Sequence, residues 1–361
     1  MSDMPIRLLA RARPEILALQ PYSSARAEAG RASIMLNANE SPWSPLGSDA
    51  STLNRYPDPQ PPALRARLAE LYGVADENVL VGRGSDEAID LLVRAFCSEG
   101  RDAIVVSPPT FGMYAVAART QGAAVIEAPL AKGLEVDVDA LLARVTDNTK
   151  LVFVCTPNNP TGALVPLTAI AKLALALHDR ALVVVDEAYL EFADGAPSAT
   201  ALITRQDNIA VLRTLSKAYA LAGARIGTLI AHAQIVALLR RIQAPYPLPT
   251  VCVDAALAAL TPNALDEARV RMRLLMRERE RVARGLASAT GVMQVLPSSA
   301  NFLCVRCADA AATYRALLAI GIIVRDVSRY AQLADCLRIT IGTPDENDAL
   351  LRALGQREAA A

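Results

Sequence analysis

The stretch Thr214-Leu-Ser-Lys217 places a lone lysine at the end of an apolar run, with Ser216 beside it and Arg225 eight positions later. A free lysine amine has a pKa of about 10.4, so it is a nucleophile near neutral pH only if it is desolvated, lies near other cations or is held as an imine. Ser216 and Arg225 supply a hydroxyl and a fixed cation suited to a phosphate group. These residues could serve a Schiff-base lysine, but an isolated Ser-Lys pair is more often a solvated loop, so partners elsewhere must decide.

Polar residues follow three apolar runs of the kind that forms buried strands. Parallel strands bring their carboxyl ends to one edge of a sheet, where small ligands collect. The runs and the residues that follow them are Leu151-Val-Phe-Val with Asn159, Leu182-Val-Val-Val with Asp186 and Tyr189, and Ile209-Ala-Val-Leu with Lys217. A further run, Val79-Leu-Val, leads into Ser85 and Asp86 at the start of a predicted helix, and a helix N-terminus can hold a phosphate.

A lysine amine, a carboxylate, a phenol, an amide and a phosphate cradle on one edge are the groups that a pyridoxal 5'-phosphate site needs. Asp186 could keep the pyridine nitrogen protonated, Asn159 and Tyr189 could hydrogen-bond the ring oxygen, and Phe111 could stack on the ring. Each residue alone has a simpler explanation, because Asp186 could cap a helix, Tyr189 could be a core residue and Asn-Pro-Thr-Gly could be a turn. Their order along the chain, each at a strand end, favours the cofactor site.

The positioning elements follow from an alternation of short apolar runs with helical patterns between about residues 79 and 230. This alternation predicts an α/β fold with a mostly parallel sheet covered by helices on both faces. After residue 249 the pattern changes to two helices, at about 250–260 and 264–288, and three strand-like runs at Phe302, Ile322 and Leu337. Thr343-Pro-Asp-Glu346 has the spacing of a capping box and predicts a final helix. Residues 41–62 are expected to form an extended loop.

The composition excludes several classes of protein. The formal net charge is +0, which argues against a nucleic-acid partner, and no apolar run is long enough to span a membrane. The first residues lack the pattern of a secretory signal, and the six cysteines are dispersed, so a cytoplasmic location is expected. Cys304 and Cys307 match C-x-x-C but lie in an apparent strand, where their side chains point to opposite faces. With His178 and His232 the only histidines, no metal site is predicted.

The sequence resembles the fold-type I aminotransferases and, within them, the histidinol-phosphate aminotransferases. The resemblance covers nearly the whole chain. It implies a large domain with a mostly parallel seven-stranded sheet (residues 45–249), a smaller α+β domain (250–361) and an N-terminal segment (1–44) that joins the small domain. The matching motifs are Pro21-Tyr-Ser-Ser-Ala-Arg26, Leu36-Asn-Ala-Asn-Glu40, Arg55-Tyr-Pro-Asp-Pro59, Ser107-Pro-Pro-Thr-Phe-Gly-Met-Tyr114, Pro157-Asn-Asn-Pro-Thr-Gly162, Asp186-Glu-Ala-Tyr189, Thr214 to Arg225 and Leu337-Arg-Ile-Thr-Ile-Gly342.

The resemblance also implies roles for individual residues. Lys217 would form the imine and later move the proton, and Asp186 would pair with the pyridine nitrogen. The ring oxygen would be bound by Asn159 and Tyr189, and the substrate by Tyr22, Asn39, Arg325 and Arg338. The phosphate of the cofactor would be held by Ser85, Asp86, Ser216 and Arg225, with Tyr56 from the partner subunit of a homodimer. Phe111 departs from relatives that often have tyrosine there, and stacking survives without the hydroxyl.

The reaction that the resemblance implies is a ping-pong transamination between L-histidinol phosphate and 2-oxoglutarate, which yields imidazole-acetol phosphate and L-glutamate. Three alternatives share the fold: an aromatic amino-acid aminotransferase, a decarboxylating or phosphate-releasing enzyme, and a pyridoxal-phosphate-fold regulator. A regulator would carry a DNA-binding module, for which the residues before the motif at Leu36 leave little room. A non-catalytic scaffold would leave the whole lysine constellation idle.

Overall fold

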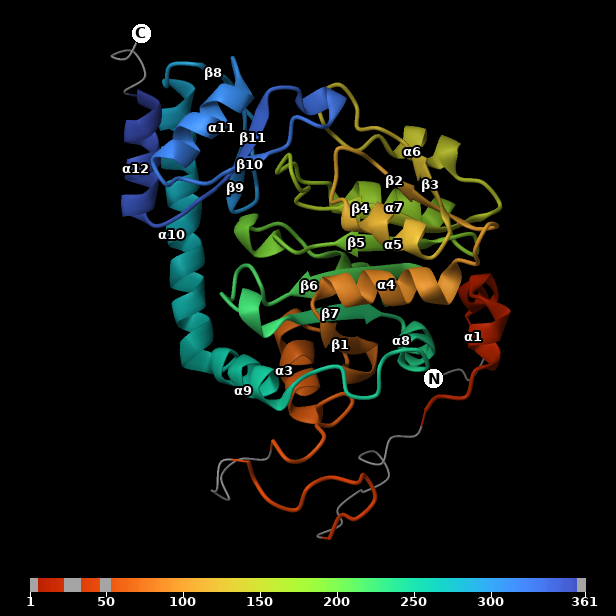
Figure 1. Cartoon of the computed structure of the whole chain (residues 1–361). Coiled ribbons are helices and arrows are strands. Elements are labelled where there is room, and N and C mark those ends of the chain that lie inside the picture. Colours follow the sequence, from red (N-terminus) through yellow and green to blue (C-terminus); the bar gives the residue numbers. More distant parts are fainter. Residues whose placement is uncertain (1–5, 23–33, 46–52, 356–361) are drawn as a thin grey trace.

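The computed structural model describes residues 6–22, 34–45 and 53–355, and its strands form two sheets (Figure 1). The larger sheet has seven strands in the order β1-β7-β6-β5-β4-β2-β3, and the smaller has four in the order β10-β11-β9-β8. The strands of the larger sheet are β1 (Val79–Arg83), β2 (Ala103–Val106), β3 (Ala124–Glu127), β4 (Thr149–Cys155), β5 (Leu182–Asp186), β6 (Ile209–Thr214) and β7 (Ile226–Ala231). Those of the smaller sheet are β8 (Val292–Val295), β9 (Phe302–Cys307), β10 (Arg325–Asp326) and β11 (Cys336–Thr340).

Helices cover both faces of the larger sheet and one face of the smaller. The α-helices are α1 (Pro14–Ala18), α3 (Pro62–Tyr72), α4 (Ser85–Phe96), α5 (Met113–Thr120), α6 (Val138–Arg144), α7 (Leu167–Ala176), α8 (Ala233–Arg240), α9 (Thr250–Ala259), α10 (Pro262–Ala287), α11 (Ala310–Ala319) and α12 (Pro344–Gly355). Short 3-10 helices are η1 (Arg7–Arg11), η2 (Asp76–Asn78), η3 (Leu190–Phe192), η4 (Ala199–Leu202), η5 (Ala222–Ala224) and η6 (Ala331–Leu333).

Strand β5 shows how the larger sheet is held between its helices. All five of its residues are buried, as in a central parallel strand. Alternate side chains point to opposite faces, so Leu182 and Val184 pack in the core with α4, α5 and α8, while Val183 and Val185 pack in the core with α6 and α7. This two-sided burial fixes the register of β5 between β4 and β6, and with it the place where each of these strands ends.

The predicted mostly parallel sheet is confirmed, and the four apolar runs named from the sequence form β1, β4, β5 and β6. Strand β7 was not among them. It follows β6 after a short connection without a long helix, and it pairs antiparallel with both β6 and β1. A search for alternating strands and helices misses such a strand, because the crossover helix that marks a parallel neighbour is absent.

The smaller sheet differs in two places from the sequence-based expectation. The strand expected at Ile322 is wrong, because the strand there is the two-residue β10, which begins at Arg325, and β8 was not expected at all. None of the four residues of β8 is fully buried, and Gln294 interrupts its apolar residues, so no continuous apolar run marks this strand. The opposite orientation of Cys304 and Cys307 is confirmed, since the two pack into different apolar clusters.

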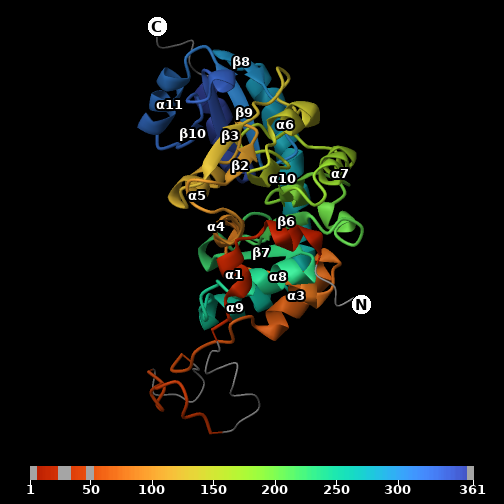
Figure 2. The same cartoon turned by 90° about the vertical axis from the view of Figure 1, so that its right-hand side faces the viewer.

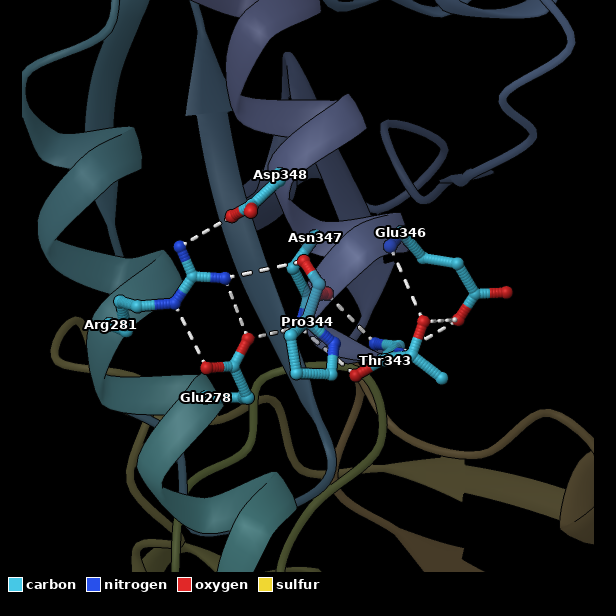
Figure 3. Close-up of polar contacts among 8 residues, drawn as sticks. Glu278, Arg281, Thr343, Pro344, Glu346, Asn347 and Asp348 are labelled. Atoms are coloured by element: carbon cyan, nitrogen blue, oxygen red, sulfur yellow. Dashed lines mark hydrogen bonds and ion pairs between the residues drawn. The ribbon is translucent and has the colours of Figure 1, made fainter.

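The final helix begins with the capping box that the sequence predicts, as Figure 3 shows. The backbone N–H of Thr343 donates to Glu346 Oε2 over 2.7 Å, and the Glu346 N–H donates to Thr343 Oγ1 over 3.3 Å. Beside it, Arg281 on α10 donates to Glu278 and to Asp348 over 2.7 Å each, which joins α10 to α12. These contacts attach the end of the chain to the helix that leads into the smaller sheet.

Helix α10 connects the two lobes: it runs from α9, beneath the larger sheet, up to the smaller sheet (Figures 1 and 2). The described residues 34–45 and 53–57 lie below the body of the molecule in both views. In the described ranges no helix has both the length and the apolar character needed to cross a membrane. The domain limits expected at residues 44 and 249 stay predictions.

Candidate active site

A cavity with about 510 Å³ of empty volume lies at the carboxyl ends of β4, β5 and β6, and we call it the lysine cavity. The predicted residues that line it are Ser85, Asp86, Phe111, Asn159, Asp186, Tyr189, Ser216, Lys217 and Arg225. Three more lining residues, Cys155, Ala188 and Thr214, were not predicted. The parallel strands therefore bring together groups that lie far apart in the sequence, as expected from their positions after the strand ends.

Lys217 lies in the wall of this cavity, after β6. Its Nζ atom is 5.7 Å from the centre of the Tyr189 ring. Burial lowers the pKa of Lys217, and the nearby charges of Arg338 and Arg225 lower it further. Each of these causes disfavours the ammonium form. Lys217 is therefore neutral more often than an exposed lysine at the same pH. This is the state in which a lysine is nucleophilic.

Asp186 ends β5 and is buried, with a side chain that accepts two hydrogen bonds. Tyr114 donates its hydroxyl to Oδ2 over 2.6 Å, and the backbone N–H of Ala188 donates to Oδ1 over 3.1 Å. Burial raises the pKa of Asp186 to about 6, while the two hydrogen bonds act in the opposite direction. Burial makes the ionised form less stable than in an exposed aspartate, and a protonated ring nitrogen would stabilise it.

Asn159 connects the lysine cavity to the smaller sheet. Its Nδ2 donates to the Tyr189 hydroxyl over 3.5 Å, and its Oδ1 accepts a hydrogen bond from Arg338 over 2.5 Å. Tyr189 packs edge-on against Phe302 of β9, and the Arg338 guanidinium lies 5.4 Å from the centre of the same Phe302 ring. The amide and the phenol are therefore adjacent, and both can reach one acceptor.

The start of α4 and the β6–β7 connection form a cradle for an anion. Arg225 donates to Asp86 over 3.1 Å and to Ser216 over 3.4 Å, and its own backbone has a positive φ of 55°. Such a conformation is strained for an arginine and is concentrated at functional sites. At Gly84, where φ is 80°, a Cβ atom would lie 2.5 Å from the Arg225 guanidinium. The positive φ at Gly84 is a conformation that residues with a Cβ atom rarely adopt, so this turn favours glycine, and the donors around it fit a phosphate.

A second cavity, which we call the arginine cavity, has about 1550 Å³ of empty volume and shares Phe111 and Asn159 with the first. Arg325 and Arg338 line it and lie directly opposite each other on the antiparallel strands β10 and β11. Like charges in such a pair destabilise a sheet. Arg119 and Arg329 also line this cavity and were not predicted, because exposed arginines in loops and at helix ends carry no distinctive sequence pattern.

Three predicted residues lie away from both cavities. Tyr22 is 72% exposed and lines a depression beside α8. Asn39 and Tyr56 line a further depression, where the Tyr56 ring stacks on Tyr246 with 4.4 Å between ring centres. Within one chain these residues are therefore not brought to Lys217.

Two functional residues, Tyr114 and Thr214, were not predicted because the sequence gives little indication of their contacts. Tyr114 follows Phe111 by three positions, one helical turn, but nothing in the sequence indicates that its hydroxyl meets Asp186. Thr214 precedes Ser216 by two positions, and its hydroxyl donates to the Ser216 hydroxyl over 3.0 Å. That spacing could have placed it on the same side of the strand end.

Behind the cavity, Arg213 of β6 binds two carboxylates that lie close to Asp186 and Tyr189 in sequence. It donates to Glu187 over 2.9 Å and to Glu191 over 2.7 Å. Arg213 and both glutamates are largely buried. This network joins the end of β6 to the segment that carries the carboxylate and the phenol of the site.

Comparison with known proteins agrees with this geometry. The sequence model of the family "Aminotransferase class I and II" matches residues 31–354. A histidinol-phosphate aminotransferase of Xanthomonas campestris pv. campestris is 54% identical over 354 residues, which are 97% of this chain and 97% of that protein. One of Stenotrophomonas maltophilia is 52% identical over 358 residues, or 98% of each chain.

Solved structures share the fold. The histidinol-phosphate aminotransferase of Sinorhizobium meliloti, in complex with pyridoxal-5'-phosphate, superposes with a TM-score of 0.77 at 28% identity, covering 95% of this chain and 96% of its own. The enzyme of that name from Clostridium acetobutylicum gives 0.77 at 25% identity, covering 85% and 91%. With a family match over most of its length and a complete lysine cavity, the chain belongs to the class I and II aminotransferases, which are pyridoxal-phosphate-dependent enzymes, in the branch of the histidinol-phosphate aminotransferases.

Proposed function

We propose that this protein transfers the amino group of L-histidinol phosphate to 2-oxoglutarate, giving imidazole-acetol phosphate and L-glutamate in histidine biosynthesis. The opposed pair Arg325 and Arg338 carries the proposal, because two cations that lie opposite each other beside the lysine cavity would be stabilised by a bound anion. The amino donor, histidinol phosphate, and the amino product, glutamate, each carry an anion and an amine on one small molecule. The curated relatives with this activity in their names match along almost the entire chain.

The residues of the lysine cavity fit pyridoxal phosphate. We assign the phosphate to Ser85, Asp86, Ser216 and Arg225, around the N-terminus of α4. The ring nitrogen is assigned to Asp186, the ring oxygen to Asn159 and Tyr189, and one ring face to Phe111. The bound cofactor would supply an aldehyde that links to amines and a ring that withdraws electrons from the neighbouring carbon.

Lys217 is the residue to which we assign proton transfer. Its amine would hold the cofactor in the resting enzyme and, when free, would be the base that takes the proton from the substrate Cα. The lowered pKa of Lys217 suits this task, since the neutral amine is the proton acceptor. Its position over the Tyr189 ring keeps it on the same side of the cavity as the phenol.

The arginine cavity is assigned to the anionic end of each substrate. Arg338, held by Asn159, lies at the boundary of the two cavities, and Arg325 lies opposite it. A substrate whose phosphate lies between them would direct its amine towards Lys217. In the second half-reaction the carboxylates of 2-oxoglutarate would use the same cations.

A homodimer completes the proposal. Tyr56 is 48% exposed and, within its own chain, lies outside the lysine cavity, so it could reach the phosphate cradle of a partner subunit. Leu36 and Trp43, in the segment below the body, are 90% and 78% exposed, and large apolar side chains at such exposure favour a covering partner. Tyr22 and Asn39 are then proposed to contact substrate only in the assembly. The cytoplasm is the proposed compartment.

The test follows the two half-reactions of the purified protein by its cofactor absorbance. Histidinol phosphate alone should convert the aldehyde form to the amine form in one turnover, and 2-oxoglutarate should restore it with release of glutamate. Phenylalanine at the same concentration should react at least about tenfold more slowly, because it lacks the phosphate that the arginine pair binds.

Three results would contradict the proposal. Equal rates with phenylalanine would favour the aromatic aminotransferase. Release of carbon dioxide or inorganic phosphate from a phosphorylated amino acid, without transfer of the amine, would favour a lyase on this fold. If adding pyridoxal phosphate produced no absorbance band that borohydride could remove, the protein would not be a pyridoxal-phosphate enzyme.

A further inference from the structure

Tyr114 lies outside the lining of the lysine cavity but contacts two residues that line it. It lies in the first turn of α5, it is fully buried, and its hydroxyl donates to Asp186 Oδ2 over 2.6 Å. Its ring meets Phe111 edge-on, with 5.5 Å between ring centres, and stacks on Phe153 of β4 at 4.5 Å. One side chain thus contacts both the residue assigned to the ring nitrogen and the residue assigned to the ring face.

We propose that Tyr114 is a positioning residue for the cofactor: its hydroxyl keeps the Asp186 carboxylate ionised and aimed at the ring nitrogen, and its ring supports Phe111. This proposal rests on the proposed cofactor site. The Ala188 N–H fixes the other oxygen of Asp186, so the carboxylate is held from two sides and cannot turn away from the cavity. The remaining acceptor positions of the carboxylate are free to meet a ring N–H.

The protonation state of Tyr114 supports this arrangement. Burial raises the pKa of Tyr114 well above its ordinary value, and the neighbouring carboxylate raises it further. The phenol therefore stays protonated and donates a hydrogen bond to Asp186. A hydrogen bond donated to a carboxylate favours its ionised form. The titratable groups that face Asp186 come from several elements: Tyr114 of α5, Cys155 of β4, Asp86 of α4, Glu187 and Tyr189 after β5, and Lys217 after β6.

The pH dependence of cofactor binding separates positioning from simple packing. In Tyr114→Phe the ring contacts with Phe111 and Phe153 remain, while Asp186 loses its donor and ionises at higher pH. The ratio of the pyridoxal-phosphate dissociation constants, variant over wild type, should be about five- to tenfold near pH 6 and should fall towards one near pH 9. Contributions from Lys217 are common to both proteins and cancel in this ratio.

The experiment titrates the cofactor-free proteins with pyridoxal phosphate from about pH 6 to about pH 9. Tyr314→Phe, which makes the same chemical change on α11 in the smaller lobe, is the matched control and should give a ratio near one throughout. Thermal melting of each cofactor-free protein reports any general loss of stability. In an Asp186→Asn background, the further change Tyr114→Phe should leave the dissociation constant nearly unaltered.

The outcomes are distinct. A ratio that stays constant across pH, or a full effect of Tyr114→Phe in the Asp186→Asn background, would overturn the positioning role and leave only packing. A wild-type protein that binds no pyridoxal phosphate at any pH would overturn the proposed function itself. If Tyr114→Phe did not fold, Phe153→Leu, which removes the stacked ring but keeps the hydroxyl, should show no pH-dependent ratio, and a pH-dependent one would contradict the proposal.

Discussion

The lysine cavity and the arginine cavity share Phe111 and Asn159 but are built in different ways. The first is formed mainly by strand ends and a helix start of the seven-stranded sheet, and its carboxylate is hydrogen-bonded before any ligand enters. The second lies between the two lobes, and its cations come mostly from the smaller sheet and the loop that follows β10. The comparison indicates that the chemistry is preorganised by one sheet, whereas recognition of the anion depends on how two lobes meet.

The largest effect should come from Lys217→Ala. The variant loses the amine that holds the cofactor and moves the proton, so turnover should fall by about four orders of magnitude or more. Binding of histidinol phosphate, measured by calorimetry, should persist because the arginine cavity is unchanged. Lys172→Ala removes an exposed lysine paired with Asp139 and should keep full activity. Wild-type rates in Lys217→Ala would refute the assigned role.

Next in size is the loss of the buried ion network behind the lysine cavity. Arg213→Met leaves Glu187 and Glu191 buried without their cation, which should lower the free energy of unfolding by about 3–5 kcal/mol. Denaturation with urea measures this change. Cofactor affinity should fall as well, because the network supports the Asp186–Tyr189 segment.

The matched change in the smaller lobe is Arg281→Met. Arg281 also binds two carboxylates, Glu278 and Asp348, but its side chain is 38% exposed (Figure 3). Water can replace the lost contacts, so the free energy of unfolding, again measured with urea, should fall far less than in Arg213→Met. Cofactor affinity should not change. Equal losses in the two variants would remove the contrast drawn between the lobes.

A smaller effect, confined to the substrate, is expected for Arg338→Gln. KM for histidinol phosphate and for 2-oxoglutarate should rise about 10- to 100-fold, since a charge-assisted contact is lost in both half-reactions. Arg315→Gln, an exposed change on α11, serves as the control. A rise in KM for only one of the two substrates would show that they use different cations.

The smallest effect is a pH-dependent gain in stability from Asp186→Asn in the cofactor-free protein. The folded-state pKa of Asp186 is raised to about 6, above that of the unfolded chain, so the folded state binds the proton more tightly. Stability of the wild type should therefore fall as pH rises from about 4 to about 6, and this decline should shrink in the variant. Near pH 8 the variant should be more stable than the wild type, while binding the cofactor more weakly. If the stability of the wild type and that of the variant changed with pH by the same amount across that range, this assignment would be contradicted.

Much of the lysine cavity could be predicted because its residues follow buried strands with a clear apolar pattern. Lys217, Asp186 and Asn159 were placed together on that basis, and the structure brings them to one cavity. The contact between Tyr114 and Asp186 could not be predicted, because it depends on how α5 packs on the sheet rather than on any local pattern. Strand β7 was missed because its antiparallel pairing needs no crossover helix.

The arginine cavity was harder to predict for a related physical reason. The opposition of Arg325 and Arg338 depends on the register of a two-residue strand, and no apolar alternation marks so short an element. The resemblance to a family named both residues, but their face-to-face placement comes only from the folded chain. Tyr22, Asn39 and Tyr56 lie where one chain alone does not bring them to Lys217.

The short connection between β6 and β7 has a consequence for how such enzymes diverge. It contains both Lys217 and Arg225, and its base is closed by a hydrogen bond from the Leu215 N–H to the Ile226 carbonyl over 3.0 Å. The spacing between the amine and the phosphate anchor is thus set by a single stretch of chain, independent of lobe movement. Changes in the smaller lobe can therefore alter substrate preference without altering the spacing between the amine and the phosphate anchor.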